Sequence, residues 1–273
     1  MDIIDAHVHV FPEKIAAAAV AATNRFYAGV RSDQVSAPEE FTVYPGTPAD
    51  LAARDAAAGI ARSVVFSTAT AARQVESINS FIAGCCREYP SFIGVGTMHI
   101  DYPDFESEVK RIKALGLVGI KLHPDIQRFA LDDPRLLPLY ELMDSENLFL
   151  IAHTGDFRFD YSTPARMAHL ASLFPRMRFV AAHFGGWSQW AEARECLVLP
   201  NVYVDTSSTI GFSQPDTAAK GFEVFDPTHI FFGSDYPMWE PGIELRRLMD
   251  LHLPDRLLEM VLSENFKQFL SMG

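Results

Sequence analysis

The chain has 273 residues, of which 48% are hydrophobic and 21% charged, a composition typical of a globular protein with a large core. Its 35 acidic and 23 basic residues give a formal net charge of −12. That charge argues against nucleic acid as the main partner, because phosphate binding needs a basic surface. Three cysteines cannot form a disulfide framework, no apolar run is long enough for a membrane span, and the acidic start MDIIDA is unlike a signal peptide. We therefore expect a cytoplasmic protein that does not bind membranes.

Eight short runs rich in Val, Ile and Phe are typical of parallel strands covered on both faces. They lie at residues 3–10, 63–69, 92–100, 117–124, 148–155, 178–186, 201–208 and 229–237. Amphipathic stretches predict helices at 12–28, 48–58, 72–88, 104–115, 134–146, 164–174, 187–196, 216–224 and 242–270, the last broken at Pro254. This alternation predicts one α/β domain over residues 1–273, a (β/α)8 TIM barrel, with an open doubly wound sheet as the rival fold.

The connection after the first predicted strand is unusually long. It contains the helix predicted at 12–28 and then Pro38 and Pro45, whereas connections of this kind usually have only a handful of residues. Long loops after barrel strands often carry function. We therefore expect residues 11–47 to cover the mouth of a pocket, although an insertion that only packs on the surface is the alternative.

Polar side chains gather where the predicted strands end. They are His7 and His9 in the first strand, Lys121 and His123 in the fourth, His153 in the fifth, His183 in the sixth and Asp235 in the eighth. The carboxyl ends of all strands in a parallel barrel open on one face, which carries the catalytic groups. We therefore expect these side chains to meet in one pocket.

The HxH motif indicates a metal site. His7 and His9 have the same parity on one strand, so both imidazoles point to the same side. With His153 and Asp235 they supply three nitrogens and one carboxylate, a set that predicts a catalytic divalent ion, Zn²⁺ first, with an open position for water. Asp5 has the same parity and is expected to accept a hydrogen bond from a metal-bound imidazole.

His183 precedes two glycines that allow a tight turn. It is either a fourth histidine ligand or a general base beside the metal, and we favour the base because the ligand set is already complete. Catalysis is therefore assigned to His183 together with Asp235, which would help the departing group.

Four further residues are expected to contact the substrate. Lys121, which shares a strand face with His123, would bind a carboxylate; carbamylation to bridge two metals and an internal salt bridge are its alternatives. Arg158, in the loop after the fifth strand, suits an anionic substrate because guanidinium groups bind carboxylates well. Trp187 would form a wall of the pocket.

Taken together, these motifs resemble the amidohydrolase-related family. The motifs are DAHVH, GIKLHP, IAHTG, AHFGG and GSDYP in this order, closed by SENFKQFL. The family consists of metal-dependent barrels, and the resemblance implies His7, His9, His153 and Asp235 as ligands and His183 as the catalytic acid/base.

The function predicted from these residues is a metal-dependent hydrolase that attacks a small anionic or cyclic substrate through a metal-activated water. A non-oxidative decarboxylase with the same metal site is the alternative. A barrel that has lost catalysis and only binds a ligand is disfavoured by the complete ligand set. The expected partner is a small-molecule substrate, and the candidate assembly is a homodimer.

Overall fold

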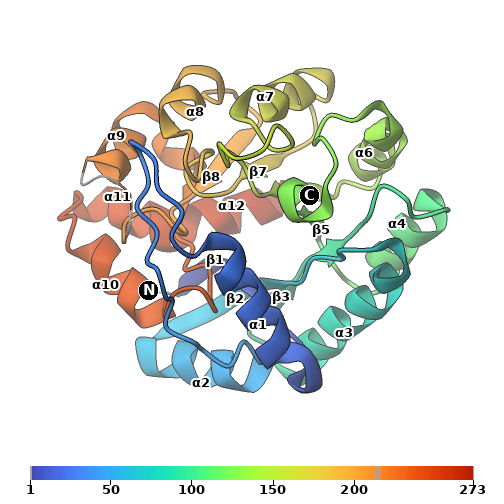
Figure 1. Cartoon of the computed structure of the whole chain (residues 1–273), viewed down its shortest axis with the longest axis horizontal. Coiled ribbons are helices and arrows are strands. Elements are labelled where there is room, and N and C mark those ends of the chain that lie inside the picture. The colour runs from blue at the N-terminus through green and yellow to red at the C-terminus, as the bar shows by residue number, and fades with distance from the viewer. Residues whose placement is uncertain (1, 212, 214–215, 273) are drawn as a thin grey trace.

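The computed structural model describes residues 2–211, 213 and 216–272. As predicted, the chain is a TIM barrel, a ring of parallel strands surrounded by helices (Figure 1). Its strands are β1 (Ile3–His9), β2 (Ile60–Phe66), β3 (Phe92–Gly94), β4 (Gly96–Thr97), β5 (Gly119–Leu122), β6 (Phe149–Ala152), β7 (Phe179–Ala181), β8 (Val202–Asp205) and β9 (Ile230–Phe231). Because β3 and β4 are two parts of one strand interrupted at Val95, the described ring has the eight strand positions that the sequence predicts.

The ring closes where the first strand meets the last. Consecutive strands pair in parallel from β1 to β3 and from β4 to β9. Beyond the end of β9, Val8 forms a parallel bridge with Tyr236, and the N–H of Asp235 donates to the carbonyl of His7 at 2.9 Å. The closure therefore brings the segment after β9 beside the end of β1, so that His7 and Asp235 become neighbours.

The helices lie close to their predicted positions. They are α1 (Glu13–Tyr27), α2 (Pro48–Ala58), α3 (Val75–Glu88), α4 (Phe105–Ala114), α5 (Pro124–Gln127), α6 (Leu137–Ser145), α7 (Pro164–Leu173), α8 (Trp190–Cys196), α9 (Thr217–Val224), α10 (Pro241–Met249), α11 (Asp255–Glu259) and α12 (Asn265–Ser271). The tail breaks at Pro254 as expected, and a π-helical turn (Met260–Glu264) joins α11 to α12. Within the described residues, no helix is both long and apolar enough to cross a membrane.

Two helices differ from prediction. The helix predicted from residue 187 begins only at Trp190, because the N–H groups of Trp187 and Ser188 donate to the carbonyls of Thr154 and Gly155 in the loop after β6. The short α5 was not predicted, since four residues are too few to show a helical period.

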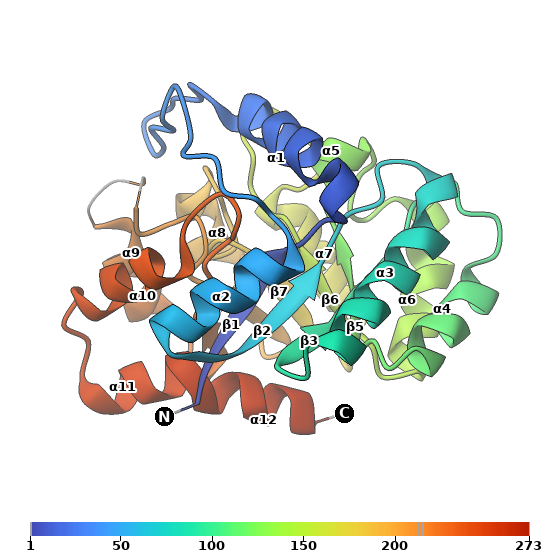
Figure 2. The ribbon, with the colours of Figure 1, turned by 90° about the horizontal axis from the view of Figure 1, so that it is seen from below.

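Apolar side chains fill the ring at the amino ends of the strands, whereas a cavity lies at their carboxyl ends. Ile4, Phe149 and Phe231 fill the inside of the ring and contact Phe266 and Phe269 of α12. Figure 2 shows α12 beneath the amino ends of the strands and α1 across the opposite end. The polar side chains at the carboxyl ends of the described strands therefore lie on the side of the ring that α1 crosses.

Candidate metal centre and active site

A cavity of about 1230 Å³ lies at the carboxyl ends of the strands. Its wall contains every polar strand-end residue singled out in the sequence, namely His7, His9, Lys121, His123, His153, His183 and Asp235. Residues of α1, from Lys14 to Tyr27, form the opposite wall. These residues therefore share one pocket, as expected, and α1 lines it, but none of the described residues 28–47 is among the lining residues. That residues 11–47 control substrate entry stays a prediction.

Three of the predicted ligands converge at the floor of this cavity. Nε2 of His7 lies 3.6 Å from Oδ1 of Asp235, and Nε2 of His9 lies 3.5 Å from the same oxygen. Ligand atoms bound tetrahedrally at about 2.1 Å are about 3.4 Å apart. Burial lowers the pKa of both imidazoles well below their usual value, which favours the neutral form that binds metals. The side chains present therefore fit a divalent ion.

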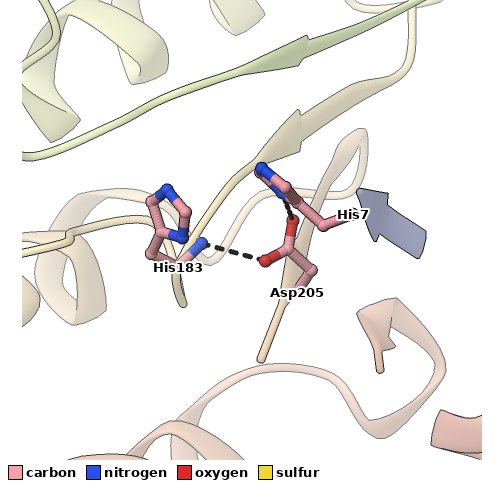
Figure 3. Close-up of side chains that lie close together, drawn as sticks. All are labelled: His7, His183 and Asp205. Atoms are coloured by element: carbon pink, nitrogen blue, oxygen red, sulfur yellow. Dashed lines mark hydrogen bonds and ion pairs between the residues drawn. The ribbon is translucent and has the colours of Figure 1, made fainter. Parts of the chain in front are cut away.

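Asp205 orients His7 for this task. Nδ1 of His7 donates to Oδ2 of Asp205 at 2.8 Å, so Nε2 faces the cavity (Figure 3). The prediction that Asp5 accepts from an imidazole is wrong, because its Oδ1 accepts from the backbone N–H groups of His7 and Ser234 instead. Asp205 has the role expected of Asp5. It was not predicted, although its position in the strand predicted at 201–208 is the same kind of signal that singled out the other residues.

Asp205 also holds His183, whose N–H donates to Oδ1 at 3.1 Å (Figure 3). Nδ1 of His183 lies 2.8 Å from Oγ of Ser207, and its Nε2 lies 3.0 Å from Nδ1 of His153. His183 has a φ of 63°, a left-handed conformation that is uncommon outside glycine and clusters at functional sites. The backbone and the ring of His183 are thus both fixed, with Nε2 facing the ring of His153, and the residue lines the cavity.

His153 is not grouped with the other predicted ligands. The described groups of His, Cys, Asp and Glu that are close enough to share one ion are His7–His9–Asp235, His7–His183–Asp205 and Asp125–His153–Asp156. Nε2 of His153 is buried and has no hydrogen-bond partner among the described residues. That nitrogen is free to bind an ion or a ligand, so the role of His153 as a ligand stays a prediction.

Lys121 lies beside the metal site. Its Nζ is 3.2 Å from Nε2 of His7 and 4.9 Å from the centre of the Phe66 ring. The side chain is buried, and no described carboxylate lies within 4.0 Å of Nζ, so the internal salt bridge considered from the sequence is not formed. Burial lowers the pKa of Lys121.

Two more of the predicted substrate contacts, His123 and Trp187, line the cavity next to α1. The His123 ring stacks on His153 with centroids 4.1 Å apart, and its Nε2 lies 2.7 Å from the Tyr27 hydroxyl. Trp187 packs against Tyr27 with centroids 4.8 Å apart. Tyr27 was not predicted, because it lies in an insertion helix and has no strand-end signal.

Arg158 has partners of its own. Its guanidinium pairs with Asp156 at 2.6 Å and donates to the carbonyl of Phe26 at 2.6 Å. It also stacks over the Phe26 ring, 4.5 Å from the centroid, and it is not among the residues that line the cavity. In this arrangement Arg158 joins the loop after β6 to the end of α1.

Comparisons with known proteins agree with this fold. A family model described as Amidohydrolase matches residues 4–270. The chain is similar to 5-carboxyvanillate decarboxylase from Sphingomonas paucimobilis, with 17% identity and a TM-score of 0.73 over 100% of this chain and 99% of that chain. A 5-carboxyvanillate decarboxylase from Novosphingobium aromaticivorans, complexed with manganese, is 14% identical with a TM-score of 0.73 over 98% and 96% of the two chains. A probable 2-pyrone-4,6-dicarboxylic acid hydrolase from Acinetobacter baumannii is 16% identical with a TM-score of 0.68 over 99% and 100%.

Proposed function

This chain belongs to the amidohydrolase family, and from that premise we propose that it is a metal-dependent decarboxylase acting on a flat organic acid. The observation that carries this proposal is Lys121, a buried amine without a paired carboxylate that lines the cavity beside His7. Burial lowers the pKa of Lys121 and the charges of Asp205 and Asp235 partly raise it, but neither carboxylate forms a direct ion pair with the amine. A substrate carboxylate next to the metal site would supply the direct counter-charge that a buried cation favours. The similarity to two decarboxylase structures supports the same choice.

The metal would be held by His7, His9 and Asp235, with His153 as the proposed fourth ligand through its free Nε2. When bound, the ion stabilises negative charge that develops on substrate oxygens. Imidazole and carboxylate ligands suit Zn²⁺ and also Mn²⁺, and manganese is the ion in one of the similar decarboxylases. Activity should therefore be measured with Zn²⁺ and with Mn²⁺.

Other residues of the cavity would bind the substrate and transfer the proton. The ammonium of Lys121 pairs with the substrate carboxylate, and the rings of Tyr27 and Trp187 hold a flat substrate between apolar surfaces. The bond between the carboxyl carbon and its neighbour breaks, CO₂ leaves, and the electron pair stays on the neighbouring carbon. His183, held by Ser207 and Asp205, passes a proton from Nε2 to that carbon and is reprotonated by solvent.

Hydrolysis is the second candidate, and the similarity to a probable pyrone dicarboxylic acid hydrolase favours it. In that reaction Nε2 of His183 would take a proton from the attacking water. The two reactions need the same ligands but give different products, since decarboxylation removes CO₂ and hydrolysis adds water.

The test is a substrate panel with the protein loaded with Zn²⁺ or Mn²⁺. We expect CO₂ and a product lighter by one carboxyl group from at least one aromatic or unsaturated acid, and no such product from Lys121→Met protein, which keeps the length of the side chain but not its charge. Products heavier by one water, from lactones or amides and without CO₂, would overturn the decarboxylase proposal in favour of the hydrolase.

A further inference from the structure

Asp125 has an unused carboxylate oxygen on the wall of the cavity. The residue lies in α5, just after β5, and its side chain is buried but lines the cavity. Oδ2 accepts a hydrogen bond from Oγ of Ser162 at 2.5 Å. Oδ1 is buried and has no hydrogen-bond partner in the described parts of the chain. Ser162 thus fixes one oxygen, whereas no described group pairs with the other, although the residue itself lines the cavity.

The position of this oxygen matters because the proposed reaction centre is next to it. Nε2 of His153 lies 3.7 Å from Oδ2 of Asp125 and likewise has no hydrogen-bond partner among the described residues. A buried acceptor left without a hydrogen bond is unfavourable, and more so when it is charged. Such a group in a cavity wall is satisfied when a ligand brings a donor.

A second metal ion is a weaker explanation for the same residues. Asp125, His153 and Asp156 are close enough to share an ion, but the carboxylate of Asp156 is already paired with the guanidinium of Arg158. Nε and Nη2 of Arg158 contact its two carboxylate oxygens at 2.9 and 2.6 Å, and the backbone N–H of Arg158 donates to it at 3.1 Å. Because Arg158 balances the charge of Asp156, only the carboxylate of Asp125 and the imidazole of His153 remain in this group as ligands for an ion. These two groups are better suited to accept a hydrogen bond from an uncharged ligand group.

We infer that Asp125 is a specificity-determining residue whose Oδ1 accepts a hydrogen bond from a hydroxyl or amino group of the substrate. The inference rests on the proposed function for the position of the substrate carboxylate near Lys121, but it concerns recognition and not the reaction. A substrate with only apolar substituents would leave the buried Oδ1 unpaired, and a site built around a substrate hydroxyl discriminates strongly against the analogue that lacks it.

Calorimetric titration of the metal-loaded protein with benzoate, 3-hydroxybenzoate and 4-hydroxybenzoate tests this inference. We expect wild-type protein to bind at least one hydroxylated acid ten-fold or more tighter than benzoate, since a donor on the ligand would pair the otherwise unsatisfied oxygen. Asp125→Ala should bring this ratio close to one without changing metal content or affinity for benzoate. Asp125→Asn keeps the shape of the side chain and an acceptor for Ser162, turns its amide N–H toward the cavity, and should lower the ratio in the same way. Asp101→Asn, the same change on an exposed carboxylate outside the cavity, should leave the ratio unchanged.

Three outcomes would overturn the inference. They are a ratio that survives in both Asp125 variants, wild-type protein with no preference for either hydroxylated acid, and a metal content that falls from two ions to one in the variants, which would make Asp125 part of a cation site. The preference is a ratio of affinities and does not depend on catalysis, so absence of CO₂ release with the preference intact would count against the proposed function alone.

Discussion

At the scale of single residues, Asp205 explains how the polar floor of the cavity is fixed. One of its oxygens accepts from the ring of His7 and the other from the backbone of His183. The sequence predicts the parity of Asp5 and His7 on one strand, but parity cannot reveal which carboxylate an imidazole meets across the barrel. That pairing depends on the stagger between strands distant in the chain, which is why Asp5 was chosen wrongly.

We predict that Asp205→Asn weakens metal binding about 10–100-fold, the usual effect of removing the carboxylate behind a ligating histidine. The amide can still accept from Nδ1 of His7, but it lacks the charge that makes the ring a better ligand. Competition with a chromogenic chelator measures the change. Asp5→Asn should leave metal affinity close to wild type, because Asp5 interacts with Ser234 and the backbone of His7 and not with a ligating ring; equal effects of the two substitutions would contradict the assignment.

A second prediction concerns His183, which we expect to move a proton and not to hold the metal. His183→Ala should lower turnover by about 10²–10⁴, the usual contribution of a general acid or base, while metal content measured by elemental analysis stays near that of wild type. His9→Ala is the control and should lose both metal and activity. Folded but metal-free His183→Ala protein would show that His183 belongs to the ligands, the alternative left open from the sequence.

At the scale of elements, the long insertion is part of the core as well as a cover. Its length predicts a pocket mouth, and residues of α1 do line the cavity. The sequence does not reveal how α1 is attached: Val20 and Tyr27 are fully buried, Tyr27 contacts His123, and Phe26 accepts from Arg158. These contacts join segments far apart in the chain, and no local pattern encodes them.

The attachment of α1 predicts an effect of Arg158→Ala that a pure substrate contact would not produce. Loss of the hydrogen bond to Phe26 and of the stacking on its ring should raise amide hydrogen exchange over residues 13–27, because local opening becomes easier. Exchange followed by mass spectrometry measures this, with Arg176→Ala, an exposed arginine paired with Asp144, as the control. Unchanged exchange together with a raised KM for acids would instead support the direct contact predicted from the sequence.

At the scale of the whole molecule, the sequence predicts the barrel well because its signal is repeated. Eight apolar runs, five of which end in the polar residues singled out, predict one polar mouth, whichever partners the strands choose. The closure of the ring brings the proposed metal ligands together at this end of the barrel. His7 and His9 come from the first strand and Asp235 from the segment after the last, so an ion bound by them links the two ends of the ring, where the described pairing is a bridge and a few backbone hydrogen bonds.

Metal removal should therefore lower the thermal stability of the entire barrel. An ion that binds only the folded chain stabilises it by about 2.7 kcal/mol at one hundred times its Kd. For a chain of this size each kcal/mol corresponds to about 2–4 °C in Tm, so chelation should lower Tm by about 5–10 °C and reloading should restore it. Differential scanning calorimetry with Zn²⁺ and Mn²⁺ in parallel would also show which ion stabilises more. His9→Ala protein should melt at one temperature with or without chelator, because it lacks a ligand; if it shows the wild-type shift, the stabilising ion binds elsewhere and the link between the ends of the ring is wrong.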